Sequence, residues 1–393
     1  MTSVIVAGAR TPIAKFAGAY KDLSAVHLGA VAIREALSRA GVAAEQVQYV
    51  VMGHVIQAGT GQITARQAAV EAGIPKEVPA ITVNKVCLSG ASAIAIADQM
   101  VRTGELEVAV AGGMESMTQA PYVVRAARFG SRLGETELVD SMIYDGLWST
   151  FTRQQMGDAT DDVNRELGIT REEQDAWSAR SHQRAAAAWD SELLAEECVP
   201  VEVPQRKGEP LSFARDDGIR PETTTETLAA LKPAFRKDGT VTAGNASQLS
   251  DGAATIVVTS RDKAEEVGIR PLAEIIAYGM SAERFSYLHT VPALAIRNAL
   301  EKSGLSLGDI GLFEINEAFA AVALNSTRML GLSEEIVNVN GGAVALGHPI
   351  GMSGARVVLT LAYEMQRREV DLGAAAVCGG GGQSDALIIR RVT

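Results

Sequence analysis

The sequence has few cysteines, no long apolar run and no excess of basic residues, and each absence excludes a class of protein. Three cysteines in 393 residues are too few for a disulfide framework, which favours a reducing compartment. No apolar run approaches the ~20 residues of a membrane span, and the N-terminus lacks the pattern of a signal peptide. A formal charge of −11 disfavours nucleic-acid binding, which requires a basic surface. We expect a cytoplasmic protein without membrane or nucleic-acid partners.

Two further signatures are missing. The five histidines form no cluster with the spacing of metal ligands, and no glycine-rich nucleotide fingerprint follows the first apolar run. We therefore expect neither a metal site nor a permanently bound cofactor.

The residues that are present describe a compact α/β enzyme. Hydrophobic residues make up 47% of the chain, charged residues only 21%, and there are 38 glycines. Such a composition is typical of a well-buried globular protein. A chain of 393 residues is too long for one ordinary core, so we expect two or three domains.

The chain contains an internal repeat. Segment 32–41 (AIREALSRAG) returns as 295–304 (AIRNALEKSG), and Ser89-Gly90-Ala91 returns as Ser353-Gly354-Ala355, each time at the expected start of a helix. Apolar strand-like runs follow in the same order in both copies. The repeat is much longer than a solenoid unit and predicts two similar α/β domains, each with a mostly parallel sheet. It also places the turn at Cys87 and the turn at 347–351 in equivalent positions, facing each other across a cleft.

Cys87 lies between a short strand-like run at 80–83 and a helix that opens at Ser89. The partial positive charge of a helix N-terminus favours a thiolate, and a fall of about two pKa units would ionise most of this thiol at neutral pH. Taken alone, a lone cysteine of this kind is more often a buried structural residue. The second half of the chain supplies the context that favours a nucleophile.

Three motifs of that second half end strands or form glycine-rich turns. They are Asn316-Glu-Ala-Phe-Ala320 after the strand 312–315, Asn340-Gly-Gly-Ala343 leading to Gly347-His-Pro349, and Cys378 followed by four glycines. Backbone rich in glycine can approach a ligand closely. Together with the Cys87 turn and Thr240-Val-Thr-Ala-Gly-Asn-Ala-Ser247, these motifs closely resemble those of the thiolase family, in particular its biosynthetic branch, and the resemblance covers residues 2–390.

The resemblance implies a fold and domain limits. We expect an α/β protein of the thiolase fold, with two duplicated α/β domains in a layered α-β-α-β-α core and an inserted loop domain. The N-terminal domain would comprise 1–118 and 246–269, the loop domain 119–245, and the C-terminal domain 270–393. Segment 120–140 resembles the family's tetramer-forming loop, which implies a homotetramer.

The resemblance also implies a mechanism for joining two acetyl-CoA molecules into acetoacetyl-CoA and CoA. Cys87 would carry the acyl group through two ping-pong half-reactions, while His348 takes the thiol proton and Cys378 removes the α-proton of the second acetyl-CoA. Two donor pairs would stabilise the thioester oxyanions. One is His348 with a water held by Asn316, and the other is the backbone N–H groups of Cys87 and Gly380.

Acyl-CoA thioesters are thus the expected substrates, and the inserted region is expected to hold CoA. The residues that resemble CoA contacts of the family are Leu147, Met156, Arg220, Phe235, Ala243, Gly244, Ser247, Leu249, Ala318 and Phe319. Segment 201–240 has seven basic and seven acidic residues and is neutral in an acidic chain. That balance fits either a solvated loop or a surface that tolerates phosphate.

Two positions depart from the biosynthetic branch, which usually reads His-Met-Gly where this chain has Gln155-Met156-Gly157, and has a methionine near Leu288. Both are expected near the acyl pocket, so the chain length of the substrate stays open. The alternatives are a degradative 3-ketoacyl-CoA thiolase with a longer pocket and, from another class, a non-catalytic scaffold on the same fold.

Overall fold

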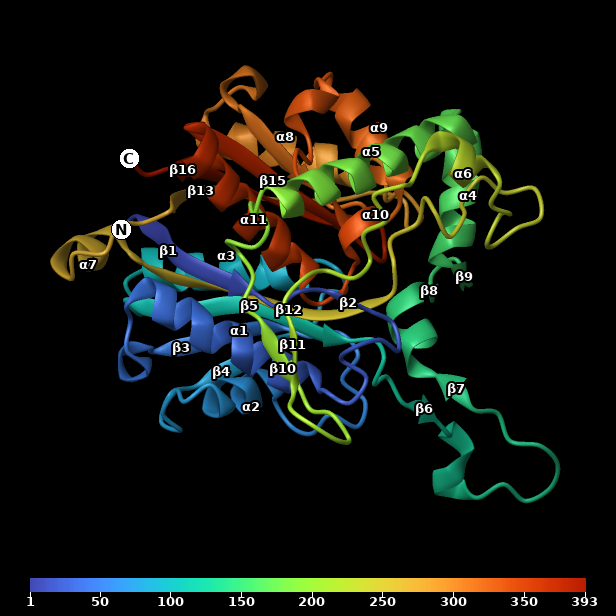
Figure 1. The fold of residues 1–393 in the computed structure, drawn as a ribbon, viewed down its shortest axis with the longest axis horizontal. Helices are drawn as coiled ribbons and strands as arrows, with labels where there is room; N and C mark the ends of the chain where they lie inside the picture. The colour runs from blue at the N-terminus through green and yellow to red at the C-terminus, as the bar shows by residue number, and fades with distance from the viewer.

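The computed structural model describes all 393 residues and contains two α/β halves that meet along one hydrogen-bonded path of strands (Figure 1). The order along this path is β14-β15-β16-β13-β1-β12-β5-β3-β4. The halves join where β1 pairs antiparallel with β13, through Val4 opposite Glu274 and Ile5 opposite Ala273. No helix is long and apolar enough to cross a membrane.

The first half contains strands and helices with the following bounds: β1 Ser3–Arg10, β2 Ala14–Lys15, α1 Ala25–Ala40, η1 Ala44–Gln46, β3 Tyr49–Gly53, α2 Thr64–Glu71, β4 Ala80–Val83, α3 Ser89–Arg102, β5 Val108–Ser116 and β12 Ser250–Ser260. After a short helix α7 at Arg261–Glu266, the second half follows a similar order, without counterparts of strands β2 and β4: β13 Ala273–Ala282, α8 Val291–Ser303, η4 Leu307–Asp309, β14 Leu312–Ile315, α9 Ala320–Leu330, η5 Glu334–Ile336, α10 Ala343–Leu346, α11 Ser353–Arg368, β15 Leu372–Gly379 and β16 Gln383–Arg391.

The predicted duplication is confirmed. Helix α1 corresponds to α8, strand β3 to β14, helix α3 to α11, and strand β5 to β15. The repeated Ser-Gly-Ala segments begin α3 and α11, as the sequence pattern indicated.

The expectation of a mostly parallel sheet is wrong. Only β3, β4 and β5 in the first half, and β14 with β15 in the second, pair in parallel. Strand β12 runs antiparallel to β5 and β1, and β16 runs antiparallel to β15 and β13. The reason is the connection after β5 and β15, which returns the chain antiparallel instead of through a crossover helix.

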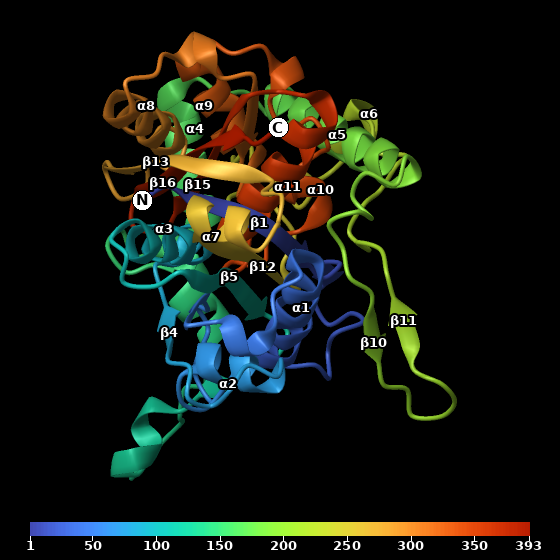
Figure 2. The ribbon, with the colours of Figure 1, turned by 90° about the vertical axis from the view of Figure 1, so that its left-hand side faces the viewer.

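The layers follow the order α-β-α-β-α (Figures 1 and 2). Helices α1 and α2 cover the outer face of the first half, and α8 and α9 cover that of the second. Helices α3 and α11 lie between the strands of the two halves (Figures 1 and 2). The central pair comes so close at Gly90 and Gly354 that a Cβ atom on Gly90 would lie 2.6 Å from the Ala355 nitrogen. Glycine is therefore required at this crossing, and it sets the distance between the halves.

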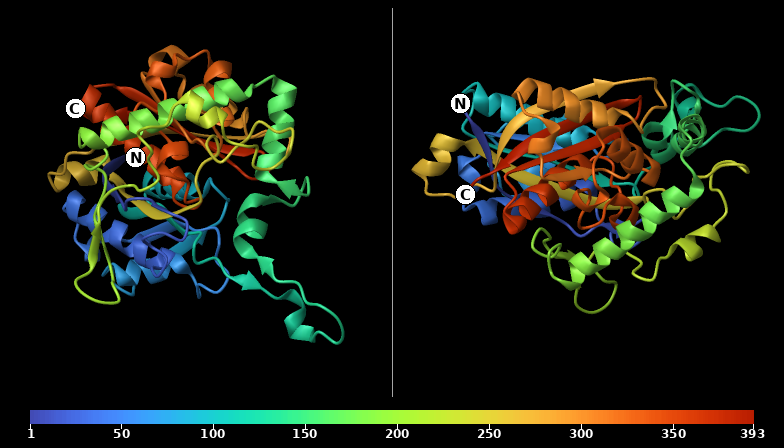
Figure 3. Two further views of the ribbon diagram at one scale, coloured as in Figure 1. Left: turned by 45° about the vertical axis from the view of Figure 1, so that its right-hand side comes forward. Right: turned by 90° about the horizontal axis from the view of Figure 1, so that it is seen from above.

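Residues 117–249 are inserted between β5 and β12. They contain β6 Tyr122–Val123, η2 Arg125–Phe129, β7 Val139–Asp140, η3 Met142–Leu147, β8 Trp148–Ser149, β9 Gln154–Gln155, α4 Met156–Leu167, α5 Arg171–Asp190, β10 Val201–Val203, β11 Leu211–Phe213 and α6 Thr225–Ala229. The β6–β7 ribbon projects away from the body, whereas α4 and α5 lie against the second half (Figure 3). The side chain of Trp177 on α5 is buried in the core of that half.

Candidate active site

The turn that carries Cys87 is tight and strained. Val86 has φ +53°, a region that β-branched residues rarely adopt. Its N–H donates to Asn84 Oδ1 at 3.1 Å, and its carbonyl oxygen accepts from Ser89 Oγ at 2.6 Å. The hydroxyl of Ser89 also accepts from the Lys85 N–H at 2.9 Å. These hydrogen bonds hold the strained residue and fix the direction of the cysteine that follows it.

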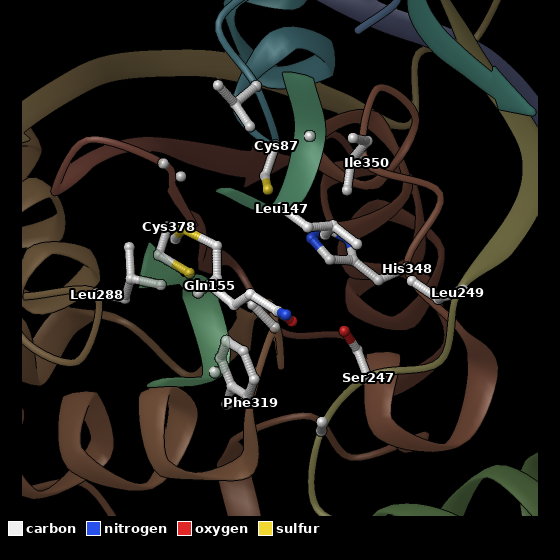
Figure 4. Close-up of a pocket in the computed structure, with 18 of the residues that line it drawn as sticks. Cys87, Leu147, Gln155, Ser247, Leu249, Leu288, Phe319, His348, Ile350 and Cys378 are labelled. Carbon is white, nitrogen blue, oxygen red and sulfur yellow. The ribbon is translucent and has the colours of Figure 1, made fainter. Parts of the chain in front are cut away.

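The tip of this turn enters a pocket of about 720 Å³, its open mouth included. Cys87 and His348 approach it from the turns before α3 and α11, and Cys378 from the end of β15. Figure 4 shows the three side chains pointing into one space. The two halves therefore contribute their equivalent turns to one pocket, as the repeat predicted.

Most of the residues singled out from the sequence line this pocket: Cys87, Leu147, Met156, Phe235, Ser247, Leu249, Ala318, Phe319, His348, Cys378 and Gly380. Gln155 and Leu288, the two departures from the family pattern, also line it. Leu147 lies at the end of η3, a single π-helical turn, and such turns are frequent at functional sites.

Four of the residues named from the sequence do not line the pocket. Asn316 lies behind His348, and Ala243 is exposed on the surface. Gly244 packs against Leu228 and Leu231. Arg220 is exposed, and its backbone N–H donates to His182 Nδ1 at 3.1 Å.

The imidazole of His348 is buried and neutral. Its Nδ1 lies 2.6 Å from Ser353 Oγ, and burial, aided by the positive charge of Arg356, lowers its pKa to about 3. Ser353 Oγ also lies 2.9 Å from the Pro349 carbonyl oxygen. Since the hydroxyl can donate there while it accepts from Nδ1–H, Nε2 is left free to take a proton.

The Cys87 thiol is also neutral, so the shift toward a thiolate that a helix N-terminus favours does not occur at rest. Burial of the sulfur raises its pKa to about 12, and the nearby Glu115 adds to the rise. The backbone N–H groups of Cys87 and Gly380 point at the sulfur and oppose the rise. These two N–H groups therefore offset only part of the effect of desolvation. Burial likewise raises the pKa of Cys378 well above its usual range.

Asn316 is oriented by a buried ion pair. Its Oδ1 accepts from the Arg356 guanidinium at 3.3 Å, and the same guanidinium lies 3.1 Å from Glu314 Oε2. The amide nitrogen thereby faces His348, at 3.5 Å from both ring nitrogens. Nothing in the local sequence signalled the role of Arg356, which lies 40 residues away.

Two buried carboxyl groups join segments around the pocket, and neither role was predicted from the sequence. Glu115 accepts from the N–H groups of Val55, Ile56 and Gly351 at 3.0–3.1 Å, and burial raises its pKa to about 8. It thus ties the loop after His348 to the first half.

Glu317, within the Asn-Glu-Ala-Phe motif, accepts from Trp177 Nε1 at 2.8 Å, from Ser181 Oγ at 2.7 Å and from the Val344 N–H at 3.1 Å. It connects the inserted helix α5 to helix α10, which gives this motif residue a structural role.

Several lining residues were missed by the sequence reasoning: Met117, Gly146 and Gln248. The side chain of Gln248 is held in place by two hydrogen bonds, which its Nε2 donates to the carbonyl oxygens of Gly218 and Val344 at 2.9 and 3.1 Å. Its only sequence signal is its position directly after Ser247. Ile350, which also lines the pocket, lay within the His348 motif but was given no role.

Comparison with known proteins places these features in a family. Residues 3–262 match the family model "Thiolase, N-terminal domain" and residues 269–391 match "Thiolase, C-terminal domain". A probable acetyl-CoA acetyltransferase of Mycolicibacterium smegmatis is 56% identical over 388 residues, 99% of this chain and 100% of the relative. The acetyl-CoA acetyltransferase of Pseudomonas aeruginosa is 50% identical, with 99% of each chain covered.

A solved structure agrees over the whole length. The crystal structure of the Bacillus anthracis acetyl-CoA acetyltransferase superimposes with a TM-score of 0.97 at 42% identity, covering 100% of this chain and 99% of that one. Family models that together span nearly all residues, relatives similar over full length and a matching fold lead to one conclusion. The chain belongs to the thiolase family.

Proposed function

We propose that this protein is an acetyl-CoA C-acetyltransferase, which interconverts two acetyl-CoA with acetoacetyl-CoA and CoA. The observation that carries the proposal is the meeting of two thiols and one neutral imidazole, Cys87, Cys378 and His348, in one pocket. The names of the full-length relatives support acetyl-CoA as the substrate.

In the first half-reaction, Cys87 Sγ attacks the carbonyl carbon of acetyl-CoA while its proton passes to His348 Nε2. A neutral thiol beside a neutral imidazole is the correct starting state for this transfer. The tetrahedral oxyanion forms where the backbone N–H groups of Cys87 and Gly380 converge, and these fixed dipoles stabilise it. The carbon–sulfur bond of acetyl-CoA then breaks, and the departing CoA thiolate takes the proton of the Cys378 thiol, while His348 keeps the proton that came from Cys87. The products are acetyl-Cys87 and free CoA.

In the second half-reaction, Cys378 acts as a thiolate and removes the α-proton of a second acetyl-CoA. The enolate oxygen is stabilised by His348 and by a water on the Asn316 amide. The α-carbon attacks the thioester carbonyl of acetyl-Cys87, and collapse of the intermediate releases acetoacetyl-CoA and the Cys87 thiolate. The proton held by His348 returns to the Cys87 thiolate, and Cys378 keeps the α-proton, so that both thiols and the neutral imidazole are restored.

Coenzyme A would enter along the inserted region, with its pantetheine arm between Phe235, Leu249 and Phe319. Ser247 would hydrogen-bond this arm, and Leu147, Met156 and Ala318 would line it. We assign Ala243, Gly244 and Arg220 to the outer part of the site, where the exposed guanidinium of Arg220 is free to contact the nucleotide. This arrangement makes CoA a substrate, with no cofactor bound between turnovers.

We also propose a cytoplasmic homotetramer with the domain limits 1–118 and 246–269, 119–245, and 270–393. The projecting β6–β7 ribbon supports the assembly, because Phe129, Leu133 and Leu138 on it are exposed and would be covered by other copies. Sedimentation equilibrium tests the tetramer.

The deciding experiment is CoA-dependent cleavage of acetoacetyl-CoA and of 3-ketooctanoyl-CoA by wild type and Cys87→Ala. Activity on the short substrate alone, lost in the variant, is expected. Equal or faster cleavage of the longer substrate would instead indicate a degradative thiolase and point to Gln155 and Leu288. If the wild type cleaves neither, the enzymatic proposal fails and a scaffold on the thiolase fold remains.

A further inference from the structure

Asp385 is a fully buried carboxylate on β16 that accepts hydrogen bonds from both halves of the molecule. Its Oδ1 lies 2.7 Å from the ammonium of Lys85, a side chain that is 26% exposed. Its Oδ2 accepts from Ser92 Oγ on α3 at 2.6 Å, and the hydroxyl of Tyr278 on β13 also bonds to it. Buried carboxylates are retained when such partners satisfy them.

The position of this group in the sheet links it to Cys378. In the β15–β16 ladder, Asp385 lies opposite Val377, and the preceding Ser384 lies opposite Cys378. Because the two strands form a continuous hydrogen-bonded hairpin, a shift of Asp385 moves the strand that carries the cysteine.

The other member of the ion pair, Lys85, belongs to the turn that carries the nucleophile. Lys85 precedes Cys87 by two residues within the turn that Asn84 and Ser89 hold by hydrogen bonds. Two apolar contacts run beside the ion pair: Leu88 packs against Gly379, and Val86 against Gly380. The Lys85–Asp385 ion pair thus connects the turn that carries Cys87 to the β15–β16 hairpin that carries Cys378.

We propose that the Lys85–Asp385 ion pair is a positioning element that fixes the separation of the Cys87 and Cys378 sulfur atoms. The inference rests on the proposed function, in which the α-carbon activated by Cys378 must reach the acyl group on Cys87. Such a step tolerates little displacement, since a misplacement of ~1 Å can cost a factor of ~10² in rate. The ion pair sets the distance between the two sulfur atoms, which lie on opposite sides of the boundary between the halves and are not carried by one helix or strand.

The test uses Asp385→Asn, Lys85→Met and the double variant. Asparagine keeps the shape of Asp385 and can still accept from Ser92, so this variant retains the fold most readily. Lys85→Met leaves a buried carboxylate without its cation, and the double variant removes both charges. Arg102→Met is the matched control, because Arg102 bonds the Ile275 carbonyl across the same boundary at the far end of α3.

Two readouts separate positioning from general stability. The first is kcat and KM for cleavage of acetoacetyl-CoA. The second is the rate at which dibromobimane cross-links Cys87 to Cys378, since the reagent becomes fluorescent only after two nearby thiols have displaced both bromides. Single-thiol labelling of Cys87 by iodoacetamide, checked by peptide mapping, controls for accessibility.

In Asp385→Asn we expect kcat to fall by about 10²-fold with little change in KM, and cross-linking to slow while single-thiol labelling does not. The double variant should be no worse than the poorer single variant, and Arg102→Met should resemble wild type in both readouts. Unchanged cross-linking in a variant that has lost activity would overturn the proposal and leave the proposed function standing. If the wild type proves inactive, the cross-linking rates alone decide whether the ion pair sets the distance.

Discussion

The connections that follow β5 and β15 occupy equivalent places in the two halves and differ greatly in length. Strand β15 reaches β16 through residues 380–382, whereas β5 reaches β12 only after residues 117–249. Both connections return the chain antiparallel and both reach the pocket. The short one supplies the backbone of Gly380, and the long one supplies side chains such as Phe235 and Ser247. Equivalent connections in a duplicated core thus have different roles. The short, rigid turn after β15 presents backbone donors to the pocket, and the long connection after β5 forms the pocket wall.

The largest expected effect comes from replacing the pocket cysteines, and it distinguishes the role of Cys378 from that of Cys87. Cys378→Ser should lower kcat for acetoacetyl-CoA synthesis by about 10³-fold, because a hydroxyl is too weakly acidic to exchange the α-proton. It should still form acetyl-Cys87 from acetyl-CoA, whereas Cys87→Ala should form no acyl-enzyme at all. Intact-protein mass spectrometry after mixing with acetyl-CoA measures this. An acyl adduct in Cys87→Ala would show that Cys87 in the first half is not the nucleophile.

A smaller effect is expected when alanine replaces a glycine of positive φ in each of the two connections, first in the short turn between β15 and β16. Gly382 has φ +69°, and a Cβ there would press on the backbone oxygens of Glu283 and Arg284. Gly382→Ala should therefore destabilise the fold by about 1–3 kcal/mol and lower kcat, because the turn that holds the Gly380 N–H must shift. Urea unfolding and steady-state kinetics measure both.

Gly208 is the matched control in the long connection. It has φ +88° with open space around its Cβ position, so Gly208→Ala should lower stability by about 1 kcal/mol and leave kcat unchanged. Equal losses of kcat in the two variants would contradict the division between a rigid turn and a supporting wall.

The effect that is smallest at neutral pH concerns the contact between the insertion and the second half. His289 is buried with Nε2 2.9 Å from Asn164 Oδ1 on α4, and burial lowers its pKa to about 3. Between the usual histidine pKa of ~6.5 and this value, the unfolded chain binds the proton and the folded chain does not, so acid destabilises the fold. Stability contributed by the neutral ring is present above pH ~6.5 and is lost as the pH falls.

His289→Gln should remove this dependence. Relative to wild type, the variant should gain up to about 1.4 kcal/mol of unfolding free energy per pH unit of acidification below pH ~6. Urea unfolding at a series of pH values measures the difference. A constant difference across the range would mean that the folded protein binds a proton at His289 near neutral pH.

Much of the fold could be predicted because its signals are local or repeated. Segments 32–41 and 295–304 carry the same helical pattern, and the copies of Ser-Gly-Ala mark the starts of α3 and α11. Strand direction was missed, because an apolar run such as 250–260 reads the same in either direction and only its pairing with β5 decides. The pocket residues that lie within motifs were found, and isolated ones such as Met117 were not.

The sequence by itself determined the duplication, the two turns that face each other and the residue types needed for acyl transfer, since these depend on order and spacing along the chain. Tertiary structure alone decided the charge state of Cys87. Removal of water raises its pKa to about 12, and no neighbour in sequence can report how much water is removed. It also decided which partners orient the site. Lys85 and Asp385 are 300 residues apart, and only folding brings their charges within hydrogen-bond distance.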